Sequence, residues 1–569
     1  MNRSIFEMAK YKNFGKMLIK PIILVMIESL SIVVLFPYFY NIILNEKINS
    51  GNIKEILIFG ALFIILALIR CLFAYLGDCE KNKCKIEMES ELRKEIYIKL
   101  QKEKIKYYDQ NRNSDILELL VNDSEEAADL FPGSFIKLYI LALFRALALI
   151  AIMLILDYRL GLITISIYFI GYLIVIGANK ISIRILNDKR NSVINLVNYT
   201  NETIKGFETV KILGIEEWRN KQLDRLISKF LYCIADLDKI TRRYTFIYQV
   251  ITFGITISNV YLGSMDIVTG ICTYASLVLI IQYSENANNY LNWIVEGMPM
   301  YNSNKLAFNK ILDYLENSNI EDYNSGKDIE EIKNIEFKNI EFSYKDTPII
   351  KKFTTSICQG EKVAFVGKTG SGKTTIANLL CRFYSVDKGN ILINGENIED
   401  FNIKTLRKKI GYVMQDNFIF EGTILENIGY ANKDISKEKI IEICKRLKIN
   451  DKIMSLPNGY ETVLKNDGSI LSNGEKQLIN FARVVILDPD VIILDEVTSA
   501  LSCEMEETIQ DAIKVLTKGK ICIIIAHRLS TIKECDRIIL LDKGKILEEG
   551  KHEELIAQKG EYYKMITEF

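Results

Sequence analysis

Long apolar windows fill the first 300 residues of the chain, whereas the remainder alternates short apolar runs with polar loops. About 20 consecutive apolar residues are enough for a helix to cross a bilayer. The windows that meet this requirement are predicted as membrane spans: 17–44, 53–78, 134–156, 159–179, 244–265 and 267–292. Residues 264–266 form nearly the only break between the last two windows. The pattern therefore predicts an all-α membrane domain of six helices.

The connections between these windows differ in length and charge. Those at 79–133 and 180–243 are long and rich in Lys and Arg, while the alternate connections are very short. Because basic loops stay on the cytosolic side, we expect a multi-pass cell-membrane protein with both long connections and both termini in the cytosol. The charged stretch Glu91–Leu100 has helical periodicity, so the long connections are predicted to be helical extensions. The first span is too long for a cleaved signal peptide and is expected to be retained.

The second half carries a phosphate-binding motif between an expected strand and an expected helix. Gly367–Thr374 fits G-x-x-x-x-G-K-[ST] and follows the apolar run Val363–Val366. Glycines let backbone N–H groups turn toward phosphates, and the N-terminus of the helix adds positive potential. We expect Lys373 to reach the β- and γ-phosphates and the Thr374 hydroxyl to bind Mg²⁺. The residues assigned to the nucleotide here are Gly367, Lys368, Thr369, Gly370, Ser371, Gly372, Lys373, Thr374 and Thr375.

Two carboxylates close a later apolar strand. The run Val491–Leu494 ends in Asp495 and Glu496. Asp495 is assigned to Mg²⁺, which it would hold through water as in other phosphate-loop enzymes. Glu496 is assigned as the catalytic carboxylate that orients or deprotonates the attacking water. Taken alone, a strand followed by two acids is a weak signal.

Three further polar or aromatic side chains extend the candidate site. Gln415 ends an apolar run and is assigned to both the metal and the catalytic set. His527 closes the run 523–526 and is also assigned to the catalytic set. Its imidazole would hydrogen-bond a γ-phosphate, although a His after a strand is more often structural. Tyr344 precedes the phosphate motif and is placed to stack on the nucleotide base, although a lone Tyr there more often packs against the protein.

Together these motifs resemble the nucleotide-binding domain of the ATP-binding cassette (ABC) transporters, from about residue 335 to the C-terminus. The matching elements are the A-loop Tyr344, Walker A Gly367–Thr374, Q-loop Gln415, signature Leu471–Glu475, Walker B Val491–Glu496, D-loop 499–502 and switch His527. The resemblance implies ATP and Mg²⁺ as cofactors and ATP hydrolysis as the activity. It also implies that ATP is held between Walker A of one chain and the signature of another, where Ser472 and Gly474 would donate to the γ-phosphate.

The membrane half resembles the exporter branch of the same family. Segments 106–109 and 202–211 are similar to the two loops that carry its coupling helices, although an ordinary cytosolic helical hairpin remains open for both. The expected fold is therefore a six-helix transmembrane domain with long cytosolic helical extensions, plus an α/β phosphate-loop ATPase domain. The expected boundaries are a membrane domain at 1–317, a linker at 318–334 and the ATPase domain at 335–569.

The resemblance implies a half-transporter of the P-glycoprotein-like kind, which needs a second half-transporter as its partner. Four residues depart from the family pattern: Asn466, Asn473, Glu475 and Ser502. In heterodimeric exporters, the chain that keeps the catalytic Glu often carries the weaker signature. A heterodimer therefore stays open, and a homodimer is slightly favoured.

The exported substrate is poorly specified, and an amphiphile or a peptide is the leading expectation. Glu28, Arg70 and Arg145 lie inside predicted spans, where such residues are either functional or paired between helices, and pairing is favoured. The polar stretch 283–292 indicates either a water-filled path or a cytosolic continuation of the last helix. The formal net charge of +0 gives no indication of a nucleic-acid partner. An importer on the same fold and a nucleotide-gated channel remain alternatives, the channel being disfavoured by Glu496 and His527.

Overall fold

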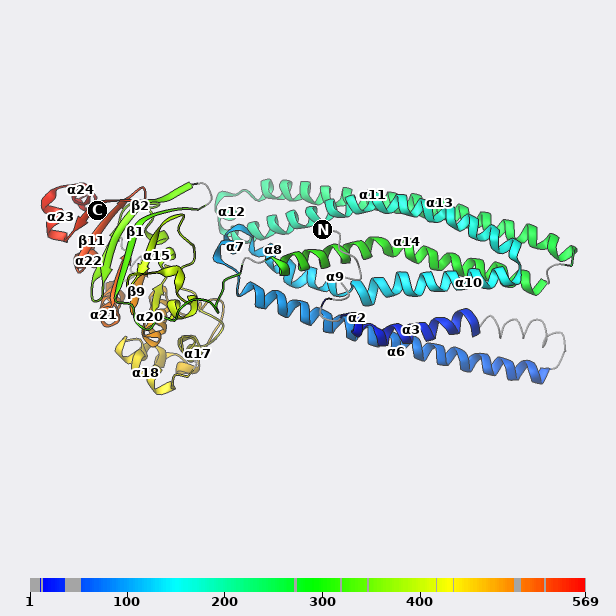
Figure 1. Cartoon of the computed structure of the whole chain (residues 1–569), viewed down its shortest axis with the longest axis horizontal. Coiled ribbons are helices and arrows are strands. Elements are labelled where there is room, and N and C mark those ends of the chain that lie inside the picture. The colour runs from blue at the N-terminus through cyan, green and yellow to red at the C-terminus, as the bar shows by residue number, and fades with distance from the viewer. Residues whose placement is uncertain are drawn as a thin grey trace. The chain divides into compact units, whose positions relative to one another are not determined.

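The computed structural model describes residues 11, 14–35, 53–270, 274–317, 320–344, 347–415, 417–432, 434–495, 503–525 and 529–567. It divides into two compact units (Figure 1): Met1–Lys102 with Asn111–Asn319, and Glu103–Gln110 with Ile320–Phe569. The first unit is helical, and the second combines β-sheets with helices.

Several helices of the first unit are far longer than a bilayer requires. Helix α6 has 48 residues, so it extends roughly 70 Å at 1.5 Å per residue, against about 30 Å for a hydrocarbon core. The elements are α2 (Phe14–Met17), α3 (Ile19–Leu30), η2 (Ser31–Leu35), α6 (Ile53–Leu100), α8 (Asn113–Glu118), η4 (Leu119–Asp123), α9 (Ser124–Ala128), η5 (Leu130–Ala142), α10 (Leu143–Leu156), α11 (Tyr158–Lys205), α12 (Phe207–Leu213), α13 (Glu216–Val268) and α14 (Tyr274–Glu316). The predicted helical extensions are thereby confirmed.

Within the described residues, three helical stretches are long and apolar enough to cross a membrane: Ile53–Leu100, Asn113–Leu156 and Glu216–Val268. Tyr158–Ile170 is a shorter apolar helix. The predicted windows 17–44 and 267–292 run over residues outside the described part of the chain. The six-span topology therefore stays a prediction.

The predicted break between the last two windows was misplaced. Residues 264–266 lie within α13, which continues to Val268 and ends in a turn at Thr269 and Gly270. Gly270 has a φ of 79°, a left-handed conformation that glycine adopts readily and that ends helices. Asp266 is buried, with its carboxylate 3.9 Å from the Arg159 guanidinium, so its charge did not interrupt the helix.

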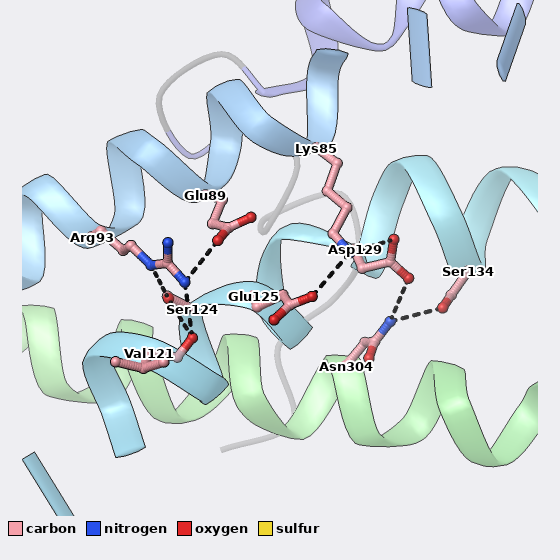
Figure 2. Close-up of polar contacts among 9 residues, drawn as sticks. All are labelled: Lys85, Glu89, Arg93, Val121, Ser124, Glu125, Asp129, Ser134 and Asn304. Carbon is pink, nitrogen blue, oxygen red and sulfur yellow. Dashed lines mark hydrogen bonds and ion pairs between the residues drawn. The ribbon is translucent and has the colours of Figure 1, made fainter. Parts of the chain in front are cut away.

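A polar network joins α6, α9, η5 and α14 in the first unit (Figure 2). Lys85 on α6 lies 3.7 Å from the Asp129 carboxylate, and Asn304 on α14 donates to both Asp129 (3.3 Å) and Ser134 (2.9 Å). A Cβ at Gly133 would lie 2.3 Å from the Asp129 carboxylate. Glycine at position 133 therefore leaves the space that lets Asp129 link α6 to α14.

The second unit is built on a six-stranded sheet of order β12-β11-β3-β10-β9-β6, beside a four-stranded sheet of order β2-β1-β4-β5. The large sheet contains β3 (Lys362–Val366), β6 (Ile410–Val413), β9 (Val491–Asp495), β10 (Ile521–Ile525), β11 (Arg537–Asp542) and β12 (Lys545–Gly550). The smaller one contains β1 (Asn334–Tyr344), β2 (Thr347–Cys358), β4 (Lys388–Ile393) and β5 (Glu396–Asn397). A third sheet pairs β7 (Gly422–Thr423) with β8 (Val463–Leu464).

The central strands are buried on both faces, which explains their unbroken apolar runs. Alternate residues of β9 enter different cores: Ile492 and Leu494 join one cluster, and Val491 and Ile493 join the other. The helices and 3-10 turns of this unit are α7 (Ile105–Gln110), α15 (Lys373–Leu380), η6 (Ile398–Asp400), α16 (Ile403–Lys408), α17 (Ile424–Gly429), α18 (Lys437–Arg446), α19 (Asn450–Ser455), η7 (Gly459–Glu461), α20 (Asn473–Leu487), α21 (Cys503–Thr517), α22 (Leu529–Lys533), α23 (His552–Gln558) and α24 (Glu561–Thr567).

The segment expected to be a linker is an ordered part of the second unit where the structure describes it. The buried Glu321 carboxylate accepts two hydrogen bonds of 2.7 Å from Arg407 on α16. Burial acts to raise the pKa of Glu321, but the Arg407 guanidinium and the Tyr323 hydroxyl outweigh it, so the pKa of this carboxyl lies below its usual value. The ion pair therefore fixes residues 320–323 to the second unit.

Candidate nucleotide site

The carboxyl ends of four parallel strands meet at one edge of the large sheet. In register, Phe365 of β3 lies beside Ile525 of β10, which lies beside Asp495 of β9. On the other side of β9, Val413 of β6 pairs with Leu494. The segments that follow these strands therefore share one edge, where ligands bind in open α/β sheets.

The phosphate loop connects β3 to α15 at this edge, as the sequence predicted. Gly367, Gly370 and Gly372 have φ values of 149°, 81° and 105°, which residues with a side chain rarely adopt. A Cβ at Gly367 would also lie 2.1 Å from the Leu541 carbonyl oxygen. The loop can therefore turn tightly into α15, whose N-terminus favours an anion.

Lys373, the first residue of α15, is folded across this loop. Its ammonium is buried and donates to the carbonyl oxygens of Gly367 (2.7 Å) and Lys368 (3.2 Å). Thr374 is exposed and Thr375 buried in the first turn of α15. The positive charge is thus held at the loop itself, within reach of a phosphate that enters it.

Asp495 is the last residue of β9 and is buried at this edge. The Tyr412 hydroxyl on β6 donates to its carboxylate over 3.2 Å, and burial, followed by the negative charge of Asp495, raises the pKa of Tyr412. Sequence reasoning missed Tyr412, because only the adjacent β6–β9 pairing reveals the contact. The hydroxyl holds the carboxylate in a fixed orientation.

The donor set fits a Mg²⁺ ion that arrives with its nucleotide. Within the described residues no group of three or more His, Cys, Asp and Glu side chains comes together. Mg²⁺ bound with a nucleotide needs only one or two protein oxygens, because phosphate oxygens and water complete its shell. Asp495 and the Thr374 hydroxyl provide such oxygens. Gln415, exposed two residues after β6, follows a strand at the same edge.

Tyr344 ends β1 in an aromatic cluster. Its ring meets Phe342 and Tyr384 edge-on, with centroids 4.9 Å and 5.1 Å away. The ring is half-buried, so protein packing accounts for part of its surface and the rest remains available to a base.

The signature Leu471–Glu475 starts α20. Ser472 is the N-cap: its hydroxyl accepts from the Glu475 N–H at 3.3 Å, and the Glu475 carboxylate accepts from the Ser472 N–H at 2.8 Å. Lys452 on α19 lies 3.2 Å from the other Glu475 oxygen. Glu475 is buried, whereas Ser472 and Asn473 are exposed. The S-x-x-E spacing was a capping signal that sequence reasoning missed.

The structure does not bring the signature to the phosphate loop of the same chain. Among the described residues, no hydrogen bond joins Ser472 or Gly474 to that loop. Glu496, His527 and the D-loop 499–502 lie outside the described residues, so their assignments stay predictions.

Arg483 on α20 fixes the segment that follows Gln415. Its guanidinium donates to the Asn427 backbone oxygen (2.7 Å) and side-chain oxygen (2.8 Å), and to the Phe418 carbonyl (2.8 Å). Asn427 is buried and in turn hydrogen-bonds Phe420. This network, also missed from the sequence, ties the helix of the signature to the loop after β6.

Within the membrane half, the pairing expected for two charged residues is confirmed. Arg145 on α10 lies 2.8 Å from the Glu28 carboxylate on α3, and both are largely buried. Arg145 also donates to Ser29 at 3.1 Å. These charges therefore neutralise each other between helices.

Comparison with known proteins agrees with this geometry. Residues 19–289 match the family described as "ABC transporter transmembrane region", and residues 350–499 match "ABC transporter". The chain is 32% identical over 540 residues to a putative multidrug export ATP-binding/permease protein of Staphylococcus aureus, covering 91% of this chain and 89% of that one. It is 31% identical over 493 residues to an ATP-dependent lipid A-core flippase of Syntrophus aciditrophicus, covering 84% and 79% respectively.

A solved structure shares the fold. It is that of a bacterial Atm1-family ABC exporter with ATP bound, with a TM-score of 0.84 and 23% identity, over 97% of this chain and 98% of that one. At this identity the likeness concerns the fold alone.

Proposed function

The chain belongs to the ABC transporter family and couples ATP hydrolysis to transport across a membrane, and on this premise we propose that two chains form an exporter of an amphiphilic substrate. The observation that carries the proposal is that the signature has exposed residues and, within the described part of the chain, no hydrogen bond to the phosphate loop of its own chain. Ser472 and Asn473 are exposed at the start of α20, and Ser472 makes no hydrogen bond to its own phosphate loop among the described residues. The signature of a second chain therefore completes the nucleotide site at each phosphate loop.

The start of α20 is suited to the γ-phosphate of a nucleotide held by another chain. A helix of 15 residues presents unpaired N–H groups and a positive partial charge at its N-terminus. The Glu475 carboxylate occupies the Ser472 N–H and the Lys452 ammonium, so its charge is engaged within its own chain. Ser472 and Gly474 then contact the phosphate without a free carboxylate between them.

The remaining roles follow from the edge of the sheet. The phosphate loop and Lys373 bind the phosphates, while Thr374, Asp495 and Gln415 would hold Mg²⁺, which would neutralise phosphate charge. Glu496 follows Asp495 directly and orients the attacking water. His527 follows β10, the neighbour of β9 and β3, and contacts the γ-phosphate.

Binding and hydrolysis are proposed to drive alternating access. ATP binds better to the closed arrangement of two ATPase domains than to the open one, and only such a difference in affinity can shift a conformational equilibrium. Hydrolysis removes the preferred ligand and resets the transporter.

A heterodimer is the second candidate, and the exposed Asn473 favours it, since the family pattern has glycine there. Glu475 supports the homodimer, because its carboxylate is already bound by the Ser472 N–H and the Lys452 ammonium of its own chain. Its departure from the family pattern therefore does not call for a different partner chain. We propose the homodimer.

The chain expressed alone and reconstituted in nanodiscs tests the proposal. We expect two-chain particles by mass and ATP turnover that Glu496→Gln abolishes. Single-chain particles without turnover would contradict it, and recovery of turnover with a second half-transporter would establish the heterodimer instead.

A further inference from the structure

One face of α14 is polar along the stretch predicted as the last membrane span. Beyond Tyr274, the exposed side chains described on α14 up to residue 293 are Gln282, Glu285, Asn286, Asn289 and Trp293. Their spacing of three and four residues places them on a single face of the helix. We call these five residues the α14 polar stripe. The opposite face carries Tyr283, Ser284 and Ala287, which are buried.

Contacts with α11 and α13 place this stripe at the depth of the bilayer interior. The Tyr168 hydroxyl donates to the Ser284 carbonyl over 2.6 Å, and Tyr168 lies about ten residues, or roughly 15 Å, from the start of α11. A hydrocarbon core is about 30 Å thick. Ser284, and with it the adjoining Glu285, therefore lies near the midplane rather than in a cytosolic continuation of α14.

A second contact gives the same depth. Gly263 on α13 packs closely against Leu277 on α14, since a Cβ added at Gly263 would lie 2.2 Å from the Leu277 side chain. The same Cβ would lie 3.5 Å from Leu160 on α11. Leu277 is therefore level with the first turn of α11. Glu285 is about eight residues, or roughly 12 Å, further along α14. Both distances are counted from the end of the bundle where α11 begins, and they give a similar depth for Glu285.

Such a face does not suit lipid. The helix α6 shows what a lipid-facing surface of this chain looks like, since its exposed side chains there are apolar: Leu57, Ile58, Leu62, Ile65, Leu68 and Leu72. An ionisable side chain at membrane depth is costly and faces a bundle interior or a water-filled cavity. The α14 polar stripe therefore faces water or another polar surface in the membrane.

We propose that the α14 polar stripe is a substrate-binding face of the transport path, and that it selects a cationic amphiphile. This inference rests on the proposed function, because the path exists only in an assembled transporter. Glu285 is the only charged member of the stripe, and three amides flank it with hydrogen-bond donors and acceptors. Trp293 offers an aromatic face to a cation. Arg145, the neighbouring buried cation, is already neutralised by Glu28 at 2.8 Å.

Two probes of the same shape and opposite charge test the substrate class. Binding of tetraphenylphosphonium and of tetraphenylborate is measured by equilibrium dialysis on the chain in nanodiscs. We expect tetraphenylphosphonium to bind the wild-type chain and Glu285→Gln to weaken it at least tenfold, while Glu285→Asp keeps most of the affinity. Asp224→Asn is the matched control, an exposed carboxylate on α13 outside the predicted spans, and should bind like the wild type.

Equal affinity of Glu285→Gln and wild type for the cation would overturn the proposal, as would wild-type preference for the borate. Dissociation of Glu285→Gln into single chains would show instead that the stripe seals two copies together, which also overturns it. Basal turnover of the wild-type chain is measured in the same preparation. Its absence counts against the proposed function, whereas its presence with unselective binding counts against the stripe alone.

Water access is checked by labelling with an impermeant thiol reagent. We expect Asn289→Cys to react above the background of the unsubstituted chain and tetraphenylphosphonium to protect it. Leu68→Cys, which is 65% exposed on α6, is the lipid-facing control and should not react. Failure of Asn289→Cys to react would overturn the proposal.

Discussion

At the scale of single residues, the proposed chemistry depends on side chains at the carboxyl ends of strands that share one sheet edge. Asp495 is held there by the Tyr412 hydroxyl, and Glu496 comes next in the chain. In the proposed mechanism, these adjacent carboxylates have different tasks, Asp495 for the metal and Glu496 for the attacking water.

Glu496→Gln should therefore keep ATP binding and lose turnover by about 10²-fold or more, because general-base groups contribute on that order. Steady-state ATPase rates and nucleotide affinity in nanodiscs measure the two effects separately. Turnover near that of the wild type would remove Glu496 from the catalytic role.

Tyr412→Phe tests the orientation of Asp495. Loss of the hydroxyl leaves the carboxylate without this donor, so we expect a higher Mg²⁺ concentration for half-maximal turnover and little change in stability. The control is Tyr460→Phe, whose hydroxyl donates to Asn450 elsewhere in the same unit. A Mg²⁺ dependence identical to wild type would show that Tyr412 does not position Asp495.

The Glu321–Arg407 pair makes a prediction about acid stability. Because the folded-state pKa of Glu321 is lowered, its contribution is fully present above the usual pKa of a Glu carboxyl and is lost as pH falls through the lowered value. Thermal unfolding of the full chain below about pH 4.5 should therefore depend less on pH in Glu321→Gln than in wild type. Glu399→Gln, a change at an exposed carboxyl, serves as control. An unchanged pH dependence in Glu321→Gln would contradict the assignment.

At the scale of elements, the chain carries two equivalent helix starts with different surroundings. Thr423 caps α17 and Ser472 caps α20, each in a complete capping box with a Glu three residues later. Removal of such a cap costs about 1 kcal/mol. Comparing variants at the two caps therefore distinguishes the effect of a cap on helix stability from its effect on nucleotide contact.

Ser472→Ala and Thr423→Ala should lower stability by similar amounts, but only Ser472→Ala should also reduce ATP turnover. Denaturant unfolding and ATPase rates measure the two quantities. Equal losses of turnover in both variants would mean that Ser472 acts only as a cap.

Which elements could be read from the sequence follows from where their contacts lie. The strands β9 and β10 are buried on both faces and appear as unbroken apolar runs, and the phosphate loop is a local pattern, so both were predictable. The end of α13 was not, because Asp266 pairs with Arg159 more than 100 residues earlier. The Tyr412–Asp495 contact and the Arg483 network also depend on partners that only the folded sheet brings together.

At the scale of the whole molecule, the distribution of basic residues predicts the orientation in the membrane. Cysteines introduced near Lys47, which lies outside the described residues, and near Asp266 should react with an impermeant reagent from outside the cell. A cysteine near Arg112 should not. Labelling of the Arg112 site in sealed cells would reverse the orientation.

The central claim is that each nucleotide site is shared between two chains, and complementation tests it most directly. Lys373→Ala disables the phosphate loop, and Gly474→Asp places a carboxylate in the signature. Each variant alone should be inactive, whereas a dimer of one with the other contains one site with an intact loop and an intact signature. Co-reconstituted variants should therefore recover a clear fraction of wild-type ATP turnover, and a mixture as inactive as its separate components would contradict the shared site.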